Sequence, residues 1–521
     1  MVTLLESYAN GSWFRSGEEG APLRDAATGE EVARISSAGL DLSAMVERAR
    51  TVGGPALRDL TFLQRADLLE AVVGVVESNL DELYELSFHT GTTRPHSAVD
   101  IFGATYTANA YVAIARSELP DAQLYLDGPV LPLSADGSFS GRHLYSSRPG
   151  VAVHINAFNF PLWGFLEKFS TSLLAGLPSI LKPASQGAYV AERAVRRIVE
   201  AGVLPDGVLQ LVSGSAAGLL DRLGVHDVVA FTGSASTAAT LRADPAVVHR
   251  GVTLGVEADS LNATILGPDV EAGSPEFDLF VQGVLTETTV KSGQKCTAIR
   301  RIFVPEERAA EVADAVAARF AEVTVGDPRR DDVTMGALVS LEQRDLVREA
   351  VRTIERSGRV VFGDPSAVDV VDGDAERGAF MGPILLQADG AAREPNEVEP
   401  FGPVTTLIPF ADLDEAAGLV ARGGGSLAGS LVTHDPDVAA QVVRAIAPWH
   451  GRILVLDRDA AAASTGHGTP LPELVHGGPG RAGGSEELSG IRSILHQMQR
   501  SAVQGSPAML DAIAGSQGGN R

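Results

Sequence analysis

Apolar residues recur at helical spacing in several separate segments of this 521-residue chain. Between residues 65 and 89 they fall at Leu68, Leu69, Val72, Val73, Val76, Leu80 and Leu83, which predicts one amphipathic helix. Similar spacing predicts further helices over residues 100–117, 162–174, 189–202, 308–323 and 341–357. The first 60 or so residues instead show short, turn-rich segments typical of strands, so we expect helices only after them.

Short apolar runs alternate with these helices in the middle of the chain. The runs cover residues 151–155, 179–181, 208–212 and 228–231, and the last two each lead into a Gly/Ser-rich turn that we expect to open a helix. A glycine-rich join over residues 423–429 leads into a further strand of a second region. This alternation predicts the α/β class, with mostly parallel sheets covered by helices on both faces.

Three segments depart from this pattern. Residues 124–145 carry Pro, Gly and Ser between short alternating runs, which indicates a hairpin-like excursion. Residues 494–503 suggest an edge strand, and the chain beyond Gly505 loses apolar density, which is typical of a loosely held tail.

Composition narrows the class of partner. The formal net charge of −24 and a pI near 4.9 argue against nucleic acid or an anionic membrane surface. The chain opens without a signal-peptide pattern and lacks an apolar run of about 18 residues, the length that spans a membrane. Together with a single cysteine, these features favour the reducing cytoplasm.

That cysteine, Cys296, is the first candidate for chemistry. A lone cysteine cannot form an internal disulfide, and most such residues are small buried apolar side chains. Cys296 nevertheless follows a Ser-Gly turn and stands beside Lys295. A nearby cation lowers a thiol pKa, and a thiolate is a nucleophile. We therefore treat Cys296 as a candidate nucleophile and Lys295 as a candidate cause of its activation.

Two polar residues upstream supply what a covalent thiol mechanism needs. Glu257 ends the apolar run 252–256, where it is either a solvated strand end or a general base whose pKa is raised by burial. Asn159 precedes Phe160 and Pro161, where it is either a turn residue or a donor to a developing oxyanion. The residues alone leave both alternatives open.

Two glycine-rich turns, over residues 214–218 and 232–236, lie where helix N-termini bind anions. Neither contains the G-x-G-x-x-G dinucleotide fingerprint, and ordinary helix capping uses the same residues. Lys182 ends the preceding strand. The three features together indicate a phosphate-bearing ligand more strongly than any one of them.

The ordered motifs Asn159-Phe-Pro161, Lys182-Pro183, Phe231-Thr-Gly-Ser234, Glu257, Gly293-Gln-Lys-Cys296 and Glu399-Pro-Phe-Gly-Pro-Val404 resemble the NAD(P)-dependent aldehyde dehydrogenase superfamily along nearly the whole chain. The resemblance implies two doubly wound α/β domains with a small β excursion for oligomerisation. It places a cofactor-binding domain at residues 1–127 and 148–256, a catalytic domain at 257–470, and oligomerisation strands at 128–147 and 490–505. A homo-oligomer, most simply a dimer, follows.

The resemblance also implies roles for residues. Cys296 would attack the aldehyde, Asn159 would hold the oxyanion, and Glu257 would activate the water that hydrolyses the thioester after hydride transfer to the nicotinamide. The implied cofactor-binding residues are Ile155, Ala157, Phe158, Lys182, Ala184, Ser185, Gly214, Gly218, Phe231, Thr232, Gly233, Ser234, Glu399 and Phe401. No metal is implied.

One departure from the family pattern bears on the cofactor. Many NAD-preferring members carry Glu where this chain has Ser185, and a carboxylate there would repel a 2′-phosphate. Ser185 beside Lys182 therefore predicts NADP, with NAD possible.

Within the superfamily, residues 154–161, 257–262, 293–301 and 476–484 resemble the dehydrogenase half of the bifunctional ring-opening protein of phenylacetate catabolism. They also resemble the semialdehyde dehydrogenase of aerobic benzoyl-CoA catabolism. The implied substrate is a CoA-linked semialdehyde: first 3-oxo-5,6-dehydrosuberyl-CoA semialdehyde, second 3,4-dehydroadipyl-CoA semialdehyde. Ring hydrolysis would then need a separate enoyl-CoA hydratase. A CoA-acylating dehydrogenase is the mechanistic alternative.

Overall fold

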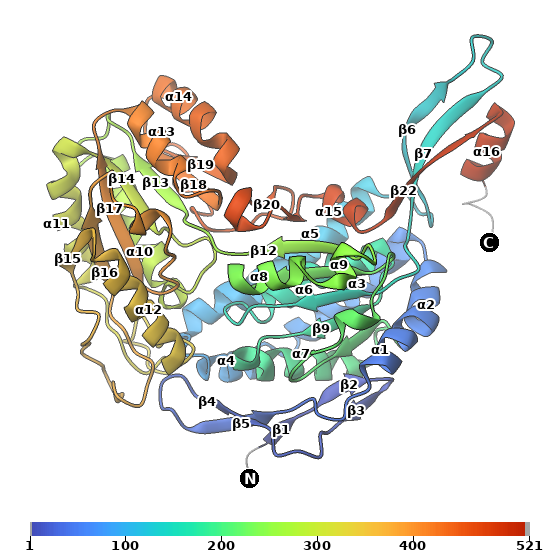
Figure 1. Cartoon of the computed structure of the whole chain (residues 1–521), viewed down its shortest axis with the longest axis horizontal. Helices are drawn as coiled ribbons and strands as arrows, with labels where there is room; N and C mark the ends of the chain where they lie inside the picture. Colours follow the sequence, from blue (N-terminus) through green and yellow to red (C-terminus); the bar gives the residue numbers. More distant parts are fainter. Residues whose placement is uncertain (1–2, 516–521) are drawn as a thin grey trace.

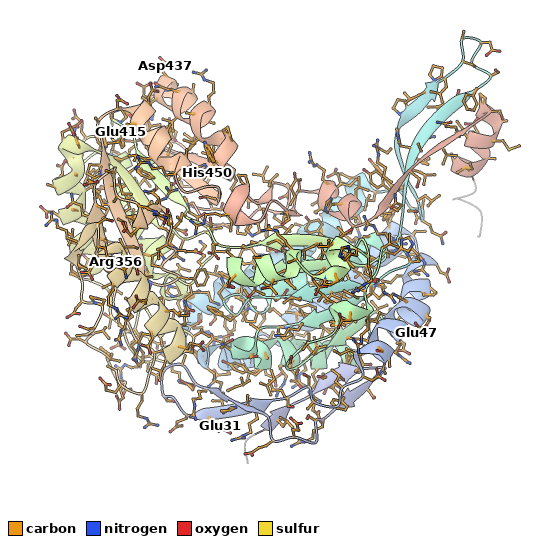
Figure 2. All side chains as sticks on the ribbon, in the orientation of Figure 1. Glu31, Glu47, Arg356, Glu415, Asp437 and His450 are labelled. Atoms are coloured by element: carbon orange, nitrogen blue, oxygen red, sulfur yellow. The ribbon has the colours of Figure 1, made fainter. Side chains whose placement is uncertain are left out.

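Two seven-stranded sheets with helices on their faces dominate the computed structural model, which describes residues 3–515 (Figure 1). Exposed acidic side chains such as Glu47, Glu415 and Asp437 lie on the periphery (Figure 2). Within the described residues, no helix is both long and apolar enough to cross a membrane.

The first sheet has a parallel core. Five strands run parallel in the order β12-β11-β8-β9-β10, and β2 and β3 extend the sheet antiparallel beyond β10. Apolar residues of α3, α5, α6 and α7 cover one face, and those of α1, η3 and α9 cover the other. The strands are β2 (Ser7–Ala9), β3 (Ser12–Phe14), β8 (Ala152–Ile155), β9 (Ser179–Lys182), β10 (Leu209–Leu211), β11 (Val228–Thr232) and β12 (Thr253–Glu257).

The helices of this region begin before and continue between those strands. They are α1 (Leu42–Arg48), η1 (Ala49–Gly53), α2 (Gly54–Arg58), α3 (Phe62–Glu77), α4 (Leu80–Phe88), α5 (Arg94–Glu118), α6 (Trp163–Ala175), η2 (Ser185–Gly187), α7 (Ala188–Ala201), η3 (Leu220–Arg222), α8 (Ala235–Arg242) and α9 (Pro245–Val248).

The second sheet, in the order β15-β16-β17-β14-β13-β18-β19, is parallel except at β15. Helices α10 and α11 cover one face, and α13 and α14 cover the other. These two sheets confirm the predicted fold class. The strands are β13 (Ala263–Leu266), β14 (Arg301–Pro305), β15 (Gly358–Phe362), β16 (Ile384–Ala388), β17 (Val404–Phe410), β18 (Ser426–Val432) and β19 (His450–Leu456). The helices are α10 (Pro275–Thr289), η4 (Val290–Gly293), η5 (Glu306–Arg308), α11 (Ala309–Phe320), α12 (Leu341–Ile354), η6 (Glu394–Asn396), α13 (Leu413–Ala421), α14 (Pro436–Ile446) and η7 (Ala447–Trp449).

A third sheet projects from the upper right of the molecule (Figure 1). It joins β6 (Tyr125–Pro132), β7 (Ser140–Ser146) and β22 (Gln499–Gly505), all antiparallel, so the predicted excursion is confirmed and its partner is a strand near the C-terminus. Smaller sheets join β1 (Thr3–Leu5), β4 (Ala21–Arg24) and β5 (Glu31–Ile35), and β20 (His476–Gly477) with β21 (Glu486–Leu488). The remaining helices are η8 (Gly480–Ala482), α15 (Ile491–His496) and α16 (Pro507–Gly515).

The prediction of one helix over residues 65–89 is wrong, because α3 ends at Glu77 and α4 begins at Leu80. The Ser78 hydroxyl donates to the Gly74 carbonyl at 2.7 Å, and the Asn79 amide donates to the Val75 carbonyl at 2.8 Å. Such side chains satisfy the last carbonyls of a helix and so compete with its continuation.

The prediction that helices start only after residue 60 is also wrong. Helix α1 begins at Leu42, where the Asp41 carboxylate caps it by accepting from the Ala44 amide. An aspartate at this position is a recognisable start signal.

At the other end, the expected strand over residues 494–503 begins only at Gln499, after α15. The expected loose tail contains α16, and Leu510 on that helix is only 3% exposed. Residues 516–521 of that tail lie outside the described part of the chain.

Candidate active site

A left-handed backbone elbow carries Cys296. Lys291, Ser292 and Gly293, which follow α10, have φ angles of 51°, 55° and 69°. Non-glycine residues rarely adopt such angles, and each costs about 1–3 kcal/mol unless the surroundings enforce it. Glycine is required at the third position, because a Cβ on Gly293 would lie 2.1 Å from the Gly402 carbonyl oxygen. The elbow therefore packs directly against the loop after Glu399.

Buried hydrogen bonds fix the chain after the elbow. The Asn262 amide donates to the carbonyls of Cys296 and Ala298 at 2.8 and 2.9 Å. The Arg300 guanidinium donates to the carbonyls of Gly293 and Gly402 at 2.9 and 2.8 Å. These bonds hold in place the backbone of Cys296 and of the residues that lead from it to β14.

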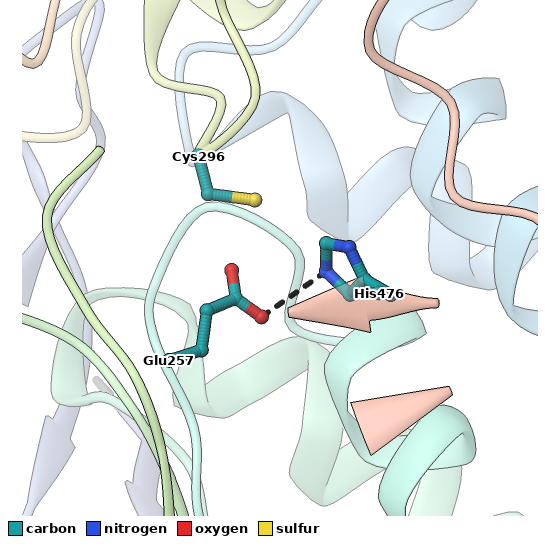
Figure 3. A group of neighbouring side chains, drawn as sticks. All are labelled: Glu257, Cys296 and His476. Carbon is teal, nitrogen blue, oxygen red and sulfur yellow. Dashed lines mark ion pairs between the residues drawn. The ribbon is translucent and has the colours of Figure 1, made fainter. Parts of the chain in front are cut away.

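Glu257 ends β12, and its side chain is almost fully buried. One carboxylate oxygen, Oε2, lies 3.1 Å from Nε2 of His476 on β20 (Figure 3). Among the described residues, the other oxygen, Oε1, has no hydrogen-bond partner. In Figure 3 this second oxygen faces the thiol of Cys296. The solvated alternative for Glu257 is therefore wrong, because the side chain is buried, but the expected rise of its pKa is wrong too.

Burial shifts the pKa values of both groups. Burial raises the pKa of the Cys296 thiol well above its ordinary value, and the charge of Glu257 raises it further. Burial also acts to raise the pKa of Glu257, but His476 and the Lys168 ammonium outweigh it, so that the pKa lies well below its ordinary value. The resting site thus pairs a protonated thiol with an ionised carboxylate, and the opposite shifts of the two pKa values keep the proton on sulfur.

The expectation that Lys295 activates the thiol is not supported. Both carboxylate oxygens of Glu287 accept from the Lys295 ammonium, at 2.9 and 3.0 Å, and both side chains are buried. Glu287 lies on α10, before the elbow, and its carboxylate therefore neutralises the Lys295 ammonium. The pKa of Cys296 is raised by burial rather than lowered.

Two cavities meet at these residues. A cleft of about 710 Å³ and a narrow inner chamber of about 60 Å³ share Asn156, Ala157, Asn159, Thr232, Glu257 and Cys296 along their linings. Asn159 comes from the loop between β8 and α6, and Cys296 and Glu257 come from segments more than 90 residues further on. The structure thus brings the three sequence-predicted side chains to the junction of the two cavities.

The wide cleft collects the predicted cofactor residues at the carboxyl ends of the first sheet's strands. All but two of them line it: Ile155, Ala157, Phe158, Lys182, Ala184, Ser185, Phe231, Thr232, Gly233, Ser234, Glu399 and Phe401. Gly214 lines an adjoining hollow that also contains Lys182 and Ser185. Gly218 lines neither of these cavities.

The absence of Gly218 from the cleft has a local cause. The turn after β10 opens the short η3 instead of the expected α-helix, so it offers no helix N-terminus to an anion. The Ser37 hydroxyl donates to the Ser215 carbonyl at 2.6 Å and ties this turn to the chain after β5. The prediction that the turn over residues 214–218 opens a helix, whose N-terminus would bind a phosphate, is therefore wrong.

The second turn does open a helix. Ser234 caps α8 by accepting from the Thr237 amide, and the Asp259 carboxylate accepts from the Ala235 amide at 2.8 Å. An internal carboxylate thus already occupies part of this helix N-terminus. Across the cleft, burial raises the pKa of Glu399 to about 7, and Asp259 raises it too against the opposing effect of Arg300.

Sequence reasoning missed three contributors to the site. His476 belongs to a glycine-rich motif that was noted without a role. Asn156 is buried, lines both cavities, and has no side-chain partner within residues 3–515. Lys168 lines the inner chamber and lies 2.9 Å from the Glu487 carboxylate. A signal for Lys168 was present in the sequence, because the chain has only four lysines: Lys168, Lys182, Lys291 and Lys295.

Comparison with known proteins agrees with this geometry. The model of the aldehyde dehydrogenase family matches residues 13–466. The chain is 43% identical over 478 residues to 3,4-dehydroadipyl-CoA semialdehyde dehydrogenase of Aromatoleum evansii, covering 91% of this chain and 93% of that protein. The chain therefore belongs to the aldehyde dehydrogenase family.

Further similarities concern a part of the chain or the fold alone. A 182-residue stretch is 48% identical to protein MaoC of Klebsiella aerogenes, covering 34% of this chain and 52% of that protein. Betaine aldehyde dehydrogenase of Staphylococcus aureus in complex with NAD+ superposes with a TM-score of 0.83 at 20% identity, covering 96% of this chain and 94% of that one. Lactaldehyde dehydrogenase of Escherichia coli gives 0.83 at 20% identity, covering 97% and 99%.

Proposed function

We propose that this aldehyde dehydrogenase oxidises the aldehyde end of a CoA-linked semialdehyde to a carboxylate, with NADP as the preferred cofactor. The observation that carries the proposal is the convergence of Cys296, Glu257 and Asn159 where the wide cleft meets the inner chamber. A thiol, a base and an amide donor at one point are the parts that covalent oxidation of a carbonyl needs.

In the proposed sequence, the Cys296 sulfur attacks the carbonyl carbon while its proton passes to Glu257. The Asn159 amide and the Cys296 backbone N–H donate to the resulting oxyanion. Bound NAD(P)+ supplies the hydride acceptor. The acyl group then remains on Cys296 as a thioester, and Glu257 releases its first proton to solvent. The freed carboxylate takes a proton from the water that attacks the thioester, and the thiolate leaves. Glu257 returns this second proton to the sulfur, which regenerates the thiol, and the carboxylic acid product ionises.

The cleft residues fit a nicotinamide dinucleotide. Buried polar atoms there, including Thr232 Oγ1 and Glu399 Oε1, have no hydrogen-bond partner in the described chain, which a ligand would supply. Glu399 Oε1 also lies 3.6 Å from Nε of Arg300. A Cβ on Gly233 would meet the Phe231 ring at 2.6 Å, so this stretch has no space for a larger residue. Glu399 would accept from ribose hydroxyls, and Phe401 would pack near the nicotinamide.

The proposed preference for NADP rests on the mouth of the cleft. Lys182 and Ser185 line both the cleft and the adjoining hollow, where a 2′-phosphate would meet an ammonium and a hydroxyl rather than a carboxylate. Glu18 and Glu19 line the same hollow and oppose an anion. The preference is therefore a balance of charges, best measured as the ratio of kcat/KM for NADP and NAD.

The similarity to a relative that matches over most of its length reverses the order of the two candidate substrates that the sequence motifs suggested. We place 3,4-dehydroadipyl-CoA semialdehyde first, because the protein of that name is 43% identical across 93% of its length. The 3-oxo-5,6-dehydrosuberyl-CoA semialdehyde of phenylacetate catabolism comes second. An inner chamber of about 60 Å³ admits a slender aldehyde chain but no CoA, which would remain outside.

A panel of free and CoA-linked aldehydes, each with NAD and with NADP, tests the proposal. We expect the highest kcat/KM with a CoA-linked semialdehyde and NADP, and a free carboxylate as product. Formation of an acyl-CoA that depends on added free CoA would instead identify an acylating enzyme, an alternative that the buried base Glu257 disfavours. Failure of every aldehyde would refute the function itself.

We also propose that the domain boundaries follow the family: a cofactor domain at residues 1–127 and 148–256, a catalytic domain at 257–470, and oligomerisation strands at 128–147 and 490–505. Exposed Leu131, Leu133 and Phe139 at the β6–β7 hairpin support an association role for the third sheet. Light scattering of the full chain and of a Leu131→Ser, Leu133→Ser variant tests the oligomer.

A further inference from the structure

We propose that His476 is a positioning residue for Glu257: it holds one carboxylate oxygen by a directed hydrogen bond and leaves the other aimed at the Cys296 thiol. The proposal rests on the proposed function, because it assigns the group that orients the base of that reaction. It concerns a histidine on β20, 219 positions beyond the carboxylate that it contacts.

The loop that carries His476 is attached to the backbone on both sides of Glu257. The Ala258 amide donates to the Ala482 carbonyl at 3.1 Å, and the Ser485 hydroxyl donates to the Val256 carbonyl at 2.7 Å. The loop therefore clamps the residues immediately before and after the base. The imidazole ring of His476 reaches the carboxylate itself, with 3.1 Å between its Nε2 and Oε2 of Glu257.

Glycine makes this close approach possible. Gly477 has a φ of 147°, and a Cβ on it would lie 1.8 Å from the Ser485 carbonyl oxygen. A Cβ on Gly451 of β19 would lie 1.7 Å from the Gly477 carbonyl oxygen. Backbones at these two positions are in contact without intervening side chains, which lets β20 carry its histidine into the interior, where the ring is 3% exposed.

Arg452 on β19 defines which ring nitrogen carries the proton. Its Nη1 lies 3.4 Å from Nδ1 of His476. A guanidinium can only donate, so Nδ1 must accept, and in the neutral ring the proton is then on Nε2. The Nε2–H in turn donates to Glu257. The hydrogen bonds therefore run in one direction, from Arg452 through His476 to the carboxylate.

The two oxygens of Glu257 consequently have different tasks. Oε2 is held by His476, whereas Oε1 has no partner among the residues described and faces the thiol (Figure 3). A hydrogen bond at one oxygen favours the orientation in which the other oxygen lies within reach of the proton it must accept. The ionisable groups around the base are Cys296, His476, Lys168, Glu167 and Glu487, and carboxylate oxygens of Glu167 and Glu487 lie within 4.8 Å of one on Glu257.

The same donors suggest a metal at first sight, since ligand atoms of Glu257, Cys296 and His476 all lie within 4.8 Å of one another. A metal on Nε2 would move the ring proton to Nδ1, where it would face the Arg452 guanidinium, a donor against a donor. Metal-bound histidines instead direct that N–H to an acceptor. The Arg452 donor at Nδ1 of His476 therefore favours a hydrogen bond from Nε2 to Glu257 over coordination of a metal.

Two substitutions separate positioning from other roles. His476→Ala removes the donor, and we expect kcat to fall by about tenfold to a hundredfold, the range for a displaced catalytic group. Because the ionised form of Glu257 loses its hydrogen bond, the acidic limb of the kcat profile should move to higher pH. His476→Gln places an amide N–H near the former Nε2 and should recover most of the rate and the original limb.

His450→Asn is the matched control, since His450 is another buried histidine and its Nδ1 bonds the Ile446 carbonyl at 3.0 Å. We expect its pH profile to equal that of the wild type. A His476→Ala enzyme that is slower with an unchanged limb would overturn the proposal in favour of a merely structural role. A Gln variant as impaired as Ala would overturn it in favour of proton transfer by the ring.

An infrared measurement separates failure of this inference from failure of the proposed function, because it needs no turnover. The difference spectrum between wild type and Glu257→Gln isolates the carboxylate stretching bands of Glu257, and that between His476→Ala and His476→Ala, Glu257→Gln isolates them without the His476 donor. Because a hydrogen bond to one oxygen shifts these bands, we expect them to differ between the two pairs. Identical bands would overturn the inference even in an enzyme that oxidises aldehydes.

Discussion

The two cavities that meet at Cys296 are built in different ways. The wide cleft, of about 710 Å³, takes most of its lining from the ends of β8, β9 and β11 and from α12, and several of its buried polar atoms await a partner. The inner chamber, of about 60 Å³, shares Asn156, Thr232 and Glu257 with the cleft and adds two lysines that are paired within the protein. Lys168 lies 2.9 Å from Glu487, and Lys295 lies 2.9 Å from Glu287.

This difference indicates what each cavity contributes. Unpaired polar atoms beside a large space recognise a ligand, because the ligand supplies the missing hydrogen bonds. The paired lysines of the chamber present no free cation to a substrate, yet Lys168 still lowers the pKa of Glu257. We therefore expect the cleft to bind the cofactor and the chamber to host the proton transfers.

The largest effect is expected at the junction itself. Cys296→Ala should lower the rate of aldehyde oxidation by about 10⁴-fold or more, as loss of a nucleophile does elsewhere. Cofactor binding, followed by fluorescence titration, should be unchanged because the cleft is intact. A variant that keeps a substantial rate would show that the reaction does not pass through the thiol.

The chamber side is tested next by Glu257→Gln, which should lower kcat by about 10²- to 10⁴-fold. Since Glu257 accepts the proton of the thiol and then that of the water, the first turnover should slow as well as the later ones. Single-turnover formation of NAD(P)H, with the mass of the intact protein and its one cysteine, separates the two steps. A first turnover at the wild-type rate would contradict the assigned role of Glu257 in accepting the thiol proton.

Asn159 belongs to both cavities, and Asn159→Ala should lower kcat by about 10²- to 10³-fold through loss of an oxyanion donor. We expect the KM for cofactor to change little, which is read from the same steady-state data. A variant that loses cofactor affinity but keeps kcat would assign Asn159 to the cleft instead.

On the cleft side, Ser185→Glu should raise the KM for NADP by at least about tenfold, because a carboxylate repels the 2′-phosphate. The KM for NAD should stay the same or fall. Ser185→Gln is the uncharged control of similar size. Equal effects of Glu and Gln would show that volume rather than charge sets the preference.

The smallest effect concerns Glu399, whose pKa is raised by burial to about 7. The carboxyl is therefore neutral below and ionised above that pH, and only the ionised form accepts charge-assisted bonds from ribose hydroxyls. The KM for cofactor should fall by about fivefold as pH rises through 7. Glu399→Gln should remove this dependence, and a variant that retains it would assign the titration to another group.

The cleft was also the part most open to prediction from sequence. Its residues follow strands that are apolar runs, and turns such as Phe231–Ser234 sit at the ends of parallel strands by the logic of the fold. The helices and strands could be located because apolar residues recur in them at regular spacing. The break between α3 and α4 depends instead on two side chains, Ser78 and Asn79, that donate hydrogen bonds back to carbonyls of α3.

The chamber was much less open to prediction. His476 reaches Glu257 only because the glycine backbones around Gly477 meet at contact distance, and no local pattern encodes that approach. Lys295 is adjacent to Cys296 in sequence but points to Glu287, because consecutive side chains on an irregular segment diverge. Pairings between distant charges depend on tertiary packing, and the order of residues along a chain does not reveal them.

The elbow before Cys296 has a consequence for how this protein can vary. Since Gly293 leaves no room for any side-chain carbon against Gly402, the nucleophile segment and the stretch bearing Glu399 and Phe401 must shift together if either shifts. The position of the Cys296 sulfur thus depends on the backbone at Gly402, so we expect an insertion near position 400 to displace the sulfur as an insertion near position 293 would.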